Sequence, residues 1–319
     1  MSWAIADKEH SSLVPCTLYS GAYHYGVGGL ANSLYRQGFR GMMCIGYAPP
    51  LPPWAEGARR DGNDMIFQVS HDFLLRFIPW PSSNNLSLEK AHFLLHVLDE
   101  VAPQADGVLF FDADITVHGS WMFFEEWLHQ GVALCLDGCY PLVPSRHPWR
   151  KGWQALALEA GYDRIRDLEY YANSGFVGVP RAERETIHCW AVLIETFLRS
   201  QSMVDNSVKF ASREQAFVGD QDMLNAALMA TNGPLSFIGP EGMDFSPAGY
   251  TMSHSIEGAK PWRKNFLVQA VSGHPPSKAD KSFWRYADYP IRLFGSIRIA
   301  AERSTMKMAS VIGRFYRRS

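Results

Sequence analysis

The sequence predicts an α/β protein built on a mixed, mainly parallel sheet, and three observations support this prediction. The first half of the chain alternates segments with strand and helix patterns. Residues 108–111 form an uninterrupted apolar run, as expected for a strand that is buried on both faces. Two acids follow this run directly, at the strand end where open α/β sheets bind their ligands.

The order of elements follows from hydrophobic period and from capping residues. Strands are expected in the segments 13–21, 41–47, 65–69, 74–80, 108–111, 132–136 and 170–180. Helices are expected at 26–38, 87–101, 122–131 and 181–200. Gly38 closes the first helix, and Ser87 is expected to cap the second. The chain shows no internal repeat.

Two prolines at 275 and 276 and the polar stretch after them indicate a boundary between a domain at 13–275 and a helical tail at 285–319. Residues 291–319 hold six arginines and one lysine against one glutamate, a net charge of +6. On a helix, one arc of this tail would be apolar: Leu293, Phe294, Ile297, Ala301, Met308, Val311, Ile312 and Phe315. Such a helix can lie on an anionic membrane or pack on the domain, and the one-sided charge favours the membrane.

Composition excludes several classes of protein. With 47% hydrophobic and 13% aromatic residues, the 319-residue chain can bury a large core. A net charge of −2 argues against a general nucleic-acid binder. Five cysteines without a CxxC pair favour reduced thiols and a cytoplasmic protein. We expect neither a secretory signal nor a spanning helix, since no suitable apolar run is present.

The two acids after the buried run, Asp112 and Asp114, are candidate metal ligands. Two carboxylates this close repel each other, and a divalent cation bound to phosphate oxygens would offset that repulsion. The same stretch also resembles the first motif of haloacid-dehalogenase-type phosphatases, in which Asp112 would be the nucleophile. More than a hundred residues precede it here, however, whereas that nucleophile usually lies near the start of its domain.

A loop late in the sequence carries residues suited to the same chemistry. His254 offers an imidazole to a transition metal, and Lys260 offers a point charge suited to a diphosphate. Gly258 would let the backbone approach a ligand closely. Two carboxylates, one imidazole and diphosphate oxygens form a plausible ligand set for Mn²⁺, whereas Mg²⁺ tolerates the nitrogen ligand less well.

Four blocks, in order, resemble GT-A-fold glycosyltransferases of the family 8 type, the relatives of glycogenin and of bacterial lipopolysaccharide galactosyltransferases. The blocks are VLFFDADITV at 108–117, YYANSGFVGV at 170–179, GDQDMLNAAL at 219–228 and HSIEGAKPW at 254–262. The resemblance implies a single GT-A (Rossmann-like) nucleotide-diphospho-sugar transferase domain followed by the basic amphipathic helix. It spans about half of the chain.

The resemblance also implies roles for individual residues. Asp112, Asp114 and His254 would hold Mn²⁺ or Mg²⁺, and Lys260 with Gly258 would contact the departing diphosphate. Asp220, Gln221 and Lys260 would be the catalytic residues, with Asp220 and Gln221 steadying the sugar ring. The other expected donor contacts are Lys90, Ala113, Asn173 and Gly175. Asn and Gln side chains offer both donors and acceptors to sugar hydroxyls, although Asp220 is equally well explained as a helix cap.

One departure concerns the nucleotide base. The family usually carries an acidic residue just after the first strand, whereas this chain has YSGAYHYG, in which Tyr23 or Tyr25 could stack on a base. A uridine diphosphate sugar remains the expected donor. Gly258 also stands one position later relative to His254 than the family's loop prefers, while the distance to Lys260 is preserved.

The expected reaction is therefore transfer of a hexose from a nucleotide diphosphate sugar to an acceptor hydroxyl, with retention at the anomeric carbon. The acceptor would be a glycan or a lipid-linked sugar of cell-surface polysaccharide or lipopolysaccharide synthesis. The protein would be cytoplasmic, with peripheral membrane contact through residues 291–319. The alternatives are the Asp112-dependent phosphatase and a non-catalytic relative that only binds nucleotide sugars.

Overall fold

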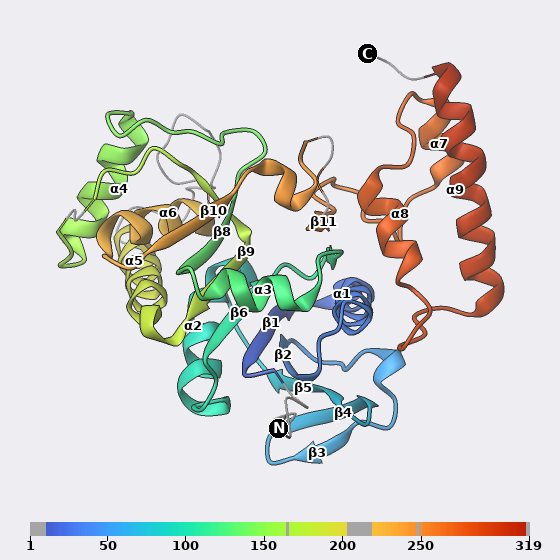
Figure 1. Ribbon diagram of the computed structural model, residues 1–319, viewed down its shortest axis with the longest axis horizontal. Coiled ribbons are helices and arrows are strands. Elements are labelled where there is room, and N and C mark those ends of the chain that lie inside the picture. The colour runs from blue at the N-terminus through green and yellow to red at the C-terminus, as the bar shows by residue number, and fades with distance from the viewer. Residues whose placement is uncertain (1–10, 164–165, 203–218, 247–248, 250, 317–319) are drawn as a thin grey trace, which may run out of the picture.

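The protein is described by a computed structural model covering residues 11–163, 166–202, 219–246, 249 and 251–316 (Figure 1). In these residues nine strands form one sheet in the order β10-β8-β9-β6-β1-β2-β5-β4-β3. The strands are β1 (Leu13–Tyr19), β2 (Gly41–Tyr47), β3 (Arg59–Asp61), β4 (Asp64–Ser70), β5 (Phe73–Pro79), β6 (Gly107–Phe111), β8 (Val132–Leu136), β9 (Ala172–Pro180) and β10 (Leu235–Ile238).

The sheet is mixed and mainly parallel around its centre, as the sequence predicts. Strand β1 pairs in parallel with both β2 and β6, and β2 pairs in parallel with β5. Strand β9 runs antiparallel to its neighbours β6 and β8. Because β9 is reversed, its first residues lie beside the last residues of β6, where Phe111 pairs with Phe176.

Helices cover both faces of this sheet. One core contains the inner sides of α1 (His24–Arg36) and α3 (Trp121–Leu128), and the other contains those of α2 (Lys90–His96), α4 (Pro148–Glu159), α5 (Arg184–Ser202) and α6 (Asp220–Ala230). All five residues of β6 are buried. This confirms the prediction of a strand that is buried on both faces of the sheet. The fold therefore places the acids after β6 between two helical layers.

A second, two-stranded sheet joins distant parts of the chain. Strand β7 (Ile115–Val117) pairs antiparallel with β11 (Met252–His254), and His254 lies opposite Ile115. Figure 1 shows this pair above α1, between the main sheet and the carboxyl-terminal helices. Neither strand was expected from the sequence, because three residues are too few to show a period.

The predicted carboxyl-terminal helix is present as α9 (Ser296–Tyr316), beside α7 (Phe266–Val271) and α8 (Lys278–Arg285). The side that packs on the protein contains Ile299, Met306, Ala309 and Gly313, none of which belongs to the predicted apolar arc. Leu293 and Phe294, which the prediction placed in that arc, precede the helix and are buried. Of the other large residues of the arc, Ile297, Met308, Val311 and Phe315 are exposed, whereas Ile312 is partly buried and packs on the core. Arg317 and Arg318 lie outside the described residues.

Two details of the predicted elements need correction. Asn85, not Ser87, caps the segment before α2, because its side chain accepts a hydrogen bond from the Ser87 backbone N–H. The helix α4 was not expected at all. The apolar residues of this segment are spaced too irregularly to predict a helix from their period. His147 caps the helix, and the burial of Trp153 stabilises it.

Asn32 fastens the carboxyl-terminal segment to α1. Its fully buried side chain donates to the carbonyl oxygens of Tyr286 (2.6 Å) and Ile291 (2.7 Å) and accepts from the Ile291 N–H (2.7 Å).

Asn32→Leu leaves three buried backbone groups without partners, so we expect the free energy of unfolding to fall by about 2 to 5 kcal/mol. Urea unfolding measures this loss. The exposed-amide control Gln104→Leu should change it by less than about 0.5 kcal/mol, and equal losses would contradict the assignment.

Candidate active site

Asp112 and Asp114 lie in a tight turn at the carboxyl end of β6. The Asp112 N–H donates to the Gly175 carbonyl oxygen (2.7 Å) and the Ile115 N–H donates to the Asp112 carbonyl oxygen (3.0 Å). The side chain of Asp114 is 7% exposed and that of Asp112 is 29% exposed. The turn therefore presents both carboxylates on the same side, one of them almost fully shielded from water.

The β7–β11 pair brings His254 to these acids. Its Nε2 lies 3.1 Å from Asp114 Oδ1 and 3.5 Å from Asp112 Oδ2. Gly175 allows this approach, because a Cβ at that position would lie 2.6 Å from the His254 ring. The structure thus brings together the three predicted metal ligands, although they come from two strands far apart in the sequence.

The geometry of this cluster fits a divalent cation. One ligand atom from each of Asp112, Asp114 and His254 lies within 4.8 Å of the others. Neighbouring ligands of a six-coordinate ion at about 2.1 Å stand roughly 3 Å apart, close to the two distances from His254 Nε2. Two carboxylate oxygens and one imidazole nitrogen suit Mn²⁺ and the later transition metals. The described residues therefore contain a set of side chains that could hold a metal ion.

Two lysines neutralise the carboxylate oxygens that face away from His254. Lys90 Nζ lies 2.9 Å from Asp112 Oδ1 and 3.1 Å from Asp220 Oδ2. Lys260 Nζ lies 2.7 Å from Asp114 Oδ2 and donates to the Ser255 carbonyl oxygen. Each acid of the pair thus keeps one oxygen for His254 or a metal and gives the other to a lysine.

These ion pairs shift pKa values against the effect of burial. Burial raises the pKa of Asp114, but His254 and Lys260 outweigh that effect and lower it to about 2. Burial likewise lowers the pKa of Lys90, yet Asp112 and Asp220 raise it overall. Asp114 is therefore ionised and Lys90 is charged at neutral pH, as a metal site with a cationic neighbour requires.

The predicted sugar-facing residues share one acid that the sequence analysis missed. Asp137 Oδ2 accepts from Asn173 Nδ2 (3.0 Å) and Gln221 Nε2 (3.2 Å). Burial raises the pKa of Asp137, but backbone and side-chain donors outweigh it and lower the value. Gln221 Oε1 in turn accepts from the Ser174 N–H (3.2 Å). Asp137 follows the predicted strand 132–136 as Asp112 follows β6, and that position was the available signal.

Asp220 does not cap the helix that it opens. It is the first residue of α6, whose cap is Gly219 without a side-chain hydrogen bond. The Asp220 carboxylate instead pairs with Lys90 inside the site. Of the two readings of Asp220, the structure therefore favours a position in the site over a capping role.

These side chains line one cavity of about 250 Å³. Its lining residues include Leu18, Ser87, Lys90, Phe110, Asp112, Asn173, Ser174, Gly175, Asp220, Gln221 and His254. Gln221 also lines a neighbouring cavity of about 200 Å³ with the aromatic residues Tyr140, Trp149 and Tyr171. A third cavity, of about 500 Å³, lies on the other side of His254 along residues 255–257. Two of these cavities therefore meet at His254, and the aromatic cavity adjoins the first one at Gln221.

The other predicted donor-site residues are Tyr23, Tyr25, Ala113 and Gly258. The Tyr23 ring centroid is 5.8 Å from Lys260 Nζ, and the ring is partly exposed. Tyr25 stacks on Phe294 with ring centroids 4.5 Å apart, which occupies one face of its ring. Ala113 is buried between the two acids. A Cβ at Gly258 would meet no described atom within 4 Å, so no close contact requires a glycine there.

Comparison with solved structures agrees with this fold. The bifunctional glycosyltransferase WbbM superposes with a TM-score of 0.52 at 13% identity, covering 92% of this chain and 52% of that one. The galactosyltransferase LgtC, solved with donor and acceptor sugar analogues, superposes with a TM-score of 0.50 at 13% identity, covering 91% of this chain and 99% of that one. The chain spans about half the length of WbbM.

Sequence comparison adds nothing to this result, since no family model and no curated protein matches the chain. The structural likeness shows that the chain has the GT-A fold of these glycosyltransferases, as its four sequence blocks imply. Fold class and the single α/β domain are thereby confirmed.

We expect the native protein to bind Mn²⁺ and His254→Ala to bind it at least about tenfold more weakly, because one of three protein ligands is lost. Isothermal titration with the metal alone measures this. His129→Ala, at an exposed histidine after α3, is the matched control and should bind like the native chain. A native chain without Mn²⁺ affinity, or equal affinity in all three proteins, would remove the proposed ligand set.

Proposed function

We propose that this chain is a metal-dependent glycosyltransferase that transfers a hexose from a nucleotide diphosphate sugar, with uridine as the expected base, to an acceptor hydroxyl. The single observation that carries the proposal is the convergence of Asp112, Asp114 and His254 beside Lys260. With a divalent cation bound, this cluster and Lys260 would neutralise phosphate oxygens, and a separate group of polar side chains lies next to it. The shared fold with glycosyltransferases supports the same reading.

In this proposal the site is divided by charge. Lys260 and a bound Mn²⁺ or Mg²⁺ would face the diphosphate, since both are cationic and sit at the same acids. Asn173, Gln221 and the Lys90–Asp220 pair would face the sugar hydroxyls, because they offer donors and acceptors side by side. Tyr23, near Lys260, is the better placed of the two tyrosines to stack on the base.

Catalysis would be mainly electrostatic. Cleavage of the bond to the anomeric carbon leaves negative charge on the diphosphate and positive charge on the sugar ring. A bound metal would supply Lewis-acid stabilisation of the leaving diphosphate. Lys260 would stabilise the same charge. Its ammonium group would move from the Asp114 carboxylate to the phosphate and so exchange one anionic partner for another. The Asp220 carboxylate would oppose the positive ring.

Retention at the anomeric carbon is part of the proposal. A covalent route would need Asp220 as a free nucleophile beneath the anomeric carbon. Its carboxylate is paired with the buried Lys90, which lowers its nucleophilicity. A route in which the departing phosphate accepts the acceptor's proton on the same face needs no such nucleophile. The Lys90–Asp220 pair therefore favours the second route.

The acceptor would enter from the aromatic cavity beside Gln221. Tyr140 and Trp149 line it, with ring centroids 5.6 Å apart. Asp137 and Asp222 also line it, and Asp222 Oδ1 accepts from the Tyr171 hydroxyl (2.8 Å). Apolar sugar faces pack on aromatic rings while their hydroxyls bind carboxylates. A glycan, free or lipid-linked, has both features.

We expect Mn²⁺-dependent hydrolysis of at least one nucleotide sugar in a panel, and a drop of about 10² to 10³ in kcat/KM for Lys260→Met. The loss follows because the leaving diphosphate keeps one cation fewer. Lys151→Met, on the exposed face of α4, is the matched control and should retain full activity. Metal-dependent donor binding without any turnover would instead indicate the non-catalytic relative. Two other results would indicate the phosphatase: hydrolysis of simple phosphate esters by the native chain and, in a separate experiment, trapping of Asp112 by beryllofluoride.

We also propose that the protein contacts an anionic membrane through the outward side of α9. This side carries Ile297 (88% exposed), Phe315 (81%), Val311 and Met308, opposite the residues that pack on the protein. Basic residues flank it, as in helices that lie in a membrane interface. No helix in the described ranges is long and apolar enough to cross a membrane.

The double variant Ile297→Ser with Phe315→Ser should bind vesicles of phosphatidylglycerol at least about tenfold more weakly than the native chain, because two large exposed side chains no longer insert. Vesicle flotation measures the bound fraction. Leu158→Ser with Met122→Ser, at exposed apolar residues away from α9, should leave binding unchanged. The same bound fraction for both double variants would exclude insertion by α9.

A further inference from the structure

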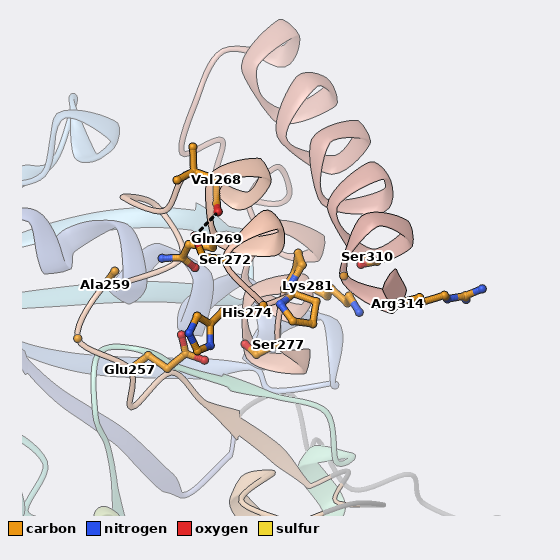
Figure 2. A pocket seen from close by; sticks show the side chains of 15 residues that line it. Glu257, Ala259, Val268, Gln269, Ser272, His274, Ser277, Lys281, Ser310 and Arg314 are labelled. Carbon is orange, nitrogen blue, oxygen red and sulfur yellow. Dashed lines mark hydrogen bonds between the residues drawn. The ribbon is translucent and has the colours of Figure 1, made fainter. Parts of the chain in front are cut away.

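A large cavity lies apart from the acids Asp112 and Asp114. It measures about 880 Å³ and lies between residues 257–259, the end of α7 with the segment 272–277, and the carboxyl-terminal part of α9. Figure 2 shows Glu257 and Ala259 at one side of this cavity and Lys281 and Ser310 at the other, with His274 between them. A neighbouring cavity of about 500 Å³ shares Lys281 and Ser310 as lining residues.

The two cavities form a groove between α8 and α9 that we call the basic groove. Its charged lining residues are the six cations Arg36, Lys281, Arg285, Arg303, Lys307 and Arg314 and the two acids Glu257 and Asp288. Both acids are already engaged. Glu257 pairs with Lys264 at 2.6 Å, and Asp288 pairs with Arg36 (3.3 Å) and Arg303 (2.8 Å).

Four cations of the basic groove lack a carboxylate partner. Within the ranges that the structure describes, no acid lies within 4.0 Å of Lys281, Arg285, Lys307 or Arg314. Lys281 and Arg285 stand four residues apart on α8, and Arg303 and Lys307 stand four apart on α9, so like charges follow one another along each helix. This arrangement is electrostatically unfavourable until an anion occupies the groove.

A hydrogen-bond donor is also left without a partner at the same place. The Ser310 hydroxyl oxygen is shielded from solvent and has no hydrogen-bond partner among the described residues. It belongs to the wall between the two cavities, where Lys281 also lies. A hydroxyl donor next to lysine and arginine cations is the combination that binds phosphate oxygens.

We propose that the basic groove binds a phosphate group, as a monoester or diester, through Lys281, Lys307 and the Ser310 hydroxyl. A phosphate supplies up to two negative charges and several acceptor oxygens, which matches cations and a hydroxyl better than a single carboxylate does. The groove shares no lining residue with the cavity that holds Asp112 and Gln221. It adjoins the other side of the site, since Gly258 lies in its wall and Glu257 and Ser277 also line the cavity beside His254. Titrations with phosphate and pyrophosphate need no transferase activity.

The position of the groove relates it to two other parts of the protein. Residues 257–259, which form its wall, directly precede Lys260, so a bound ligand would contact the segment that carries this lysine. The outward apolar side of α9 lies on the opposite side of the same helix. A phosphate held here can therefore come from a membrane lipid headgroup or from a soluble phosphate ester.

Isothermal titration of the native chain with inorganic phosphate and with pyrophosphate tests the site. We expect Lys281→Gln with Lys307→Gln to weaken binding at least about tenfold, since two charge-assisted contacts are lost. Lys281→Arg should retain binding. The control Arg59→Gln with Arg60→Gln removes two exposed charges at the far edge strand β3 and should bind like the native chain.

Two outcomes would overturn the proposal: a native chain that binds neither anion, and a control that loses as much affinity as the groove variant. A vesicle arm then separates the two sources of phosphate. If the groove variant also binds phosphatidate vesicles more weakly, while Ser310→Ala reduces phosphate affinity in the same direction, the site takes lipid headgroups. If vesicle binding is unchanged and only phosphate affinity falls, the site takes a soluble phosphate ester.

Discussion

The site depends on one short antiparallel ladder. Strands β7 and β11 have only three residues each, yet their register sets His254 opposite Ile115 and hence next to Asp114. A shift of one residue would turn His254 to the other face of the ladder. Such a short pair cannot hold itself together, so its environment must fix the register. Polar contacts behind the ladder do this: Ser253 Oγ donates to Asp244 Oδ2 (2.9 Å) and contacts His118 Nε2 (2.9 Å).

The same ladder concentrates charge, and the surrounding residues compensate for it. Three carboxylates, one imidazole and two lysines lie together, and all but Asp112 are largely shielded from water, where an unpaired charge is costly. Each carboxylate has a cationic neighbour, and this explains why the low pKa of Asp114 persists despite burial. An incoming diphosphate and metal would replace these pairs with equivalent ones. In the proposed function, binding would therefore exchange ion-pair partners and change the net charge inside the cavity little.

Sequence reasoning succeeded where a residue's neighbours are local. The buried strand before Asp112, the reversed strand with Asn173 and the start of α6 all carry their own pattern, and the structure has each of them. It did not find Asp137, whose role appears only once β8 lies beside β9 in the sheet. Nor could it find the strands of the small sheet, since their pairing is a tertiary property.

The tail shows why an amphipathic pattern is an incomplete guide. The sequence revealed one apolar arc and left open whether it packs or contacts a membrane. The structure has a helix with two apolar sides. Residues such as Ala309, Gly313 and Met306 make the packed side, while Ile297, Met308, Val311 and Phe315 of the predicted arc stay outside. The predicted arc rests on the large apolar side chains of the tail. It therefore misses the packed side, which contains small residues such as Ala309 and Gly313. With the protein side satisfied by close packing, the outer side has no intramolecular partner among the described residues, and the basic groove beside it adds unbalanced positive charge. An exposed apolar surface and unpaired cations thus lie together on the α8–α9 edge, next to the loop that leads to Lys260.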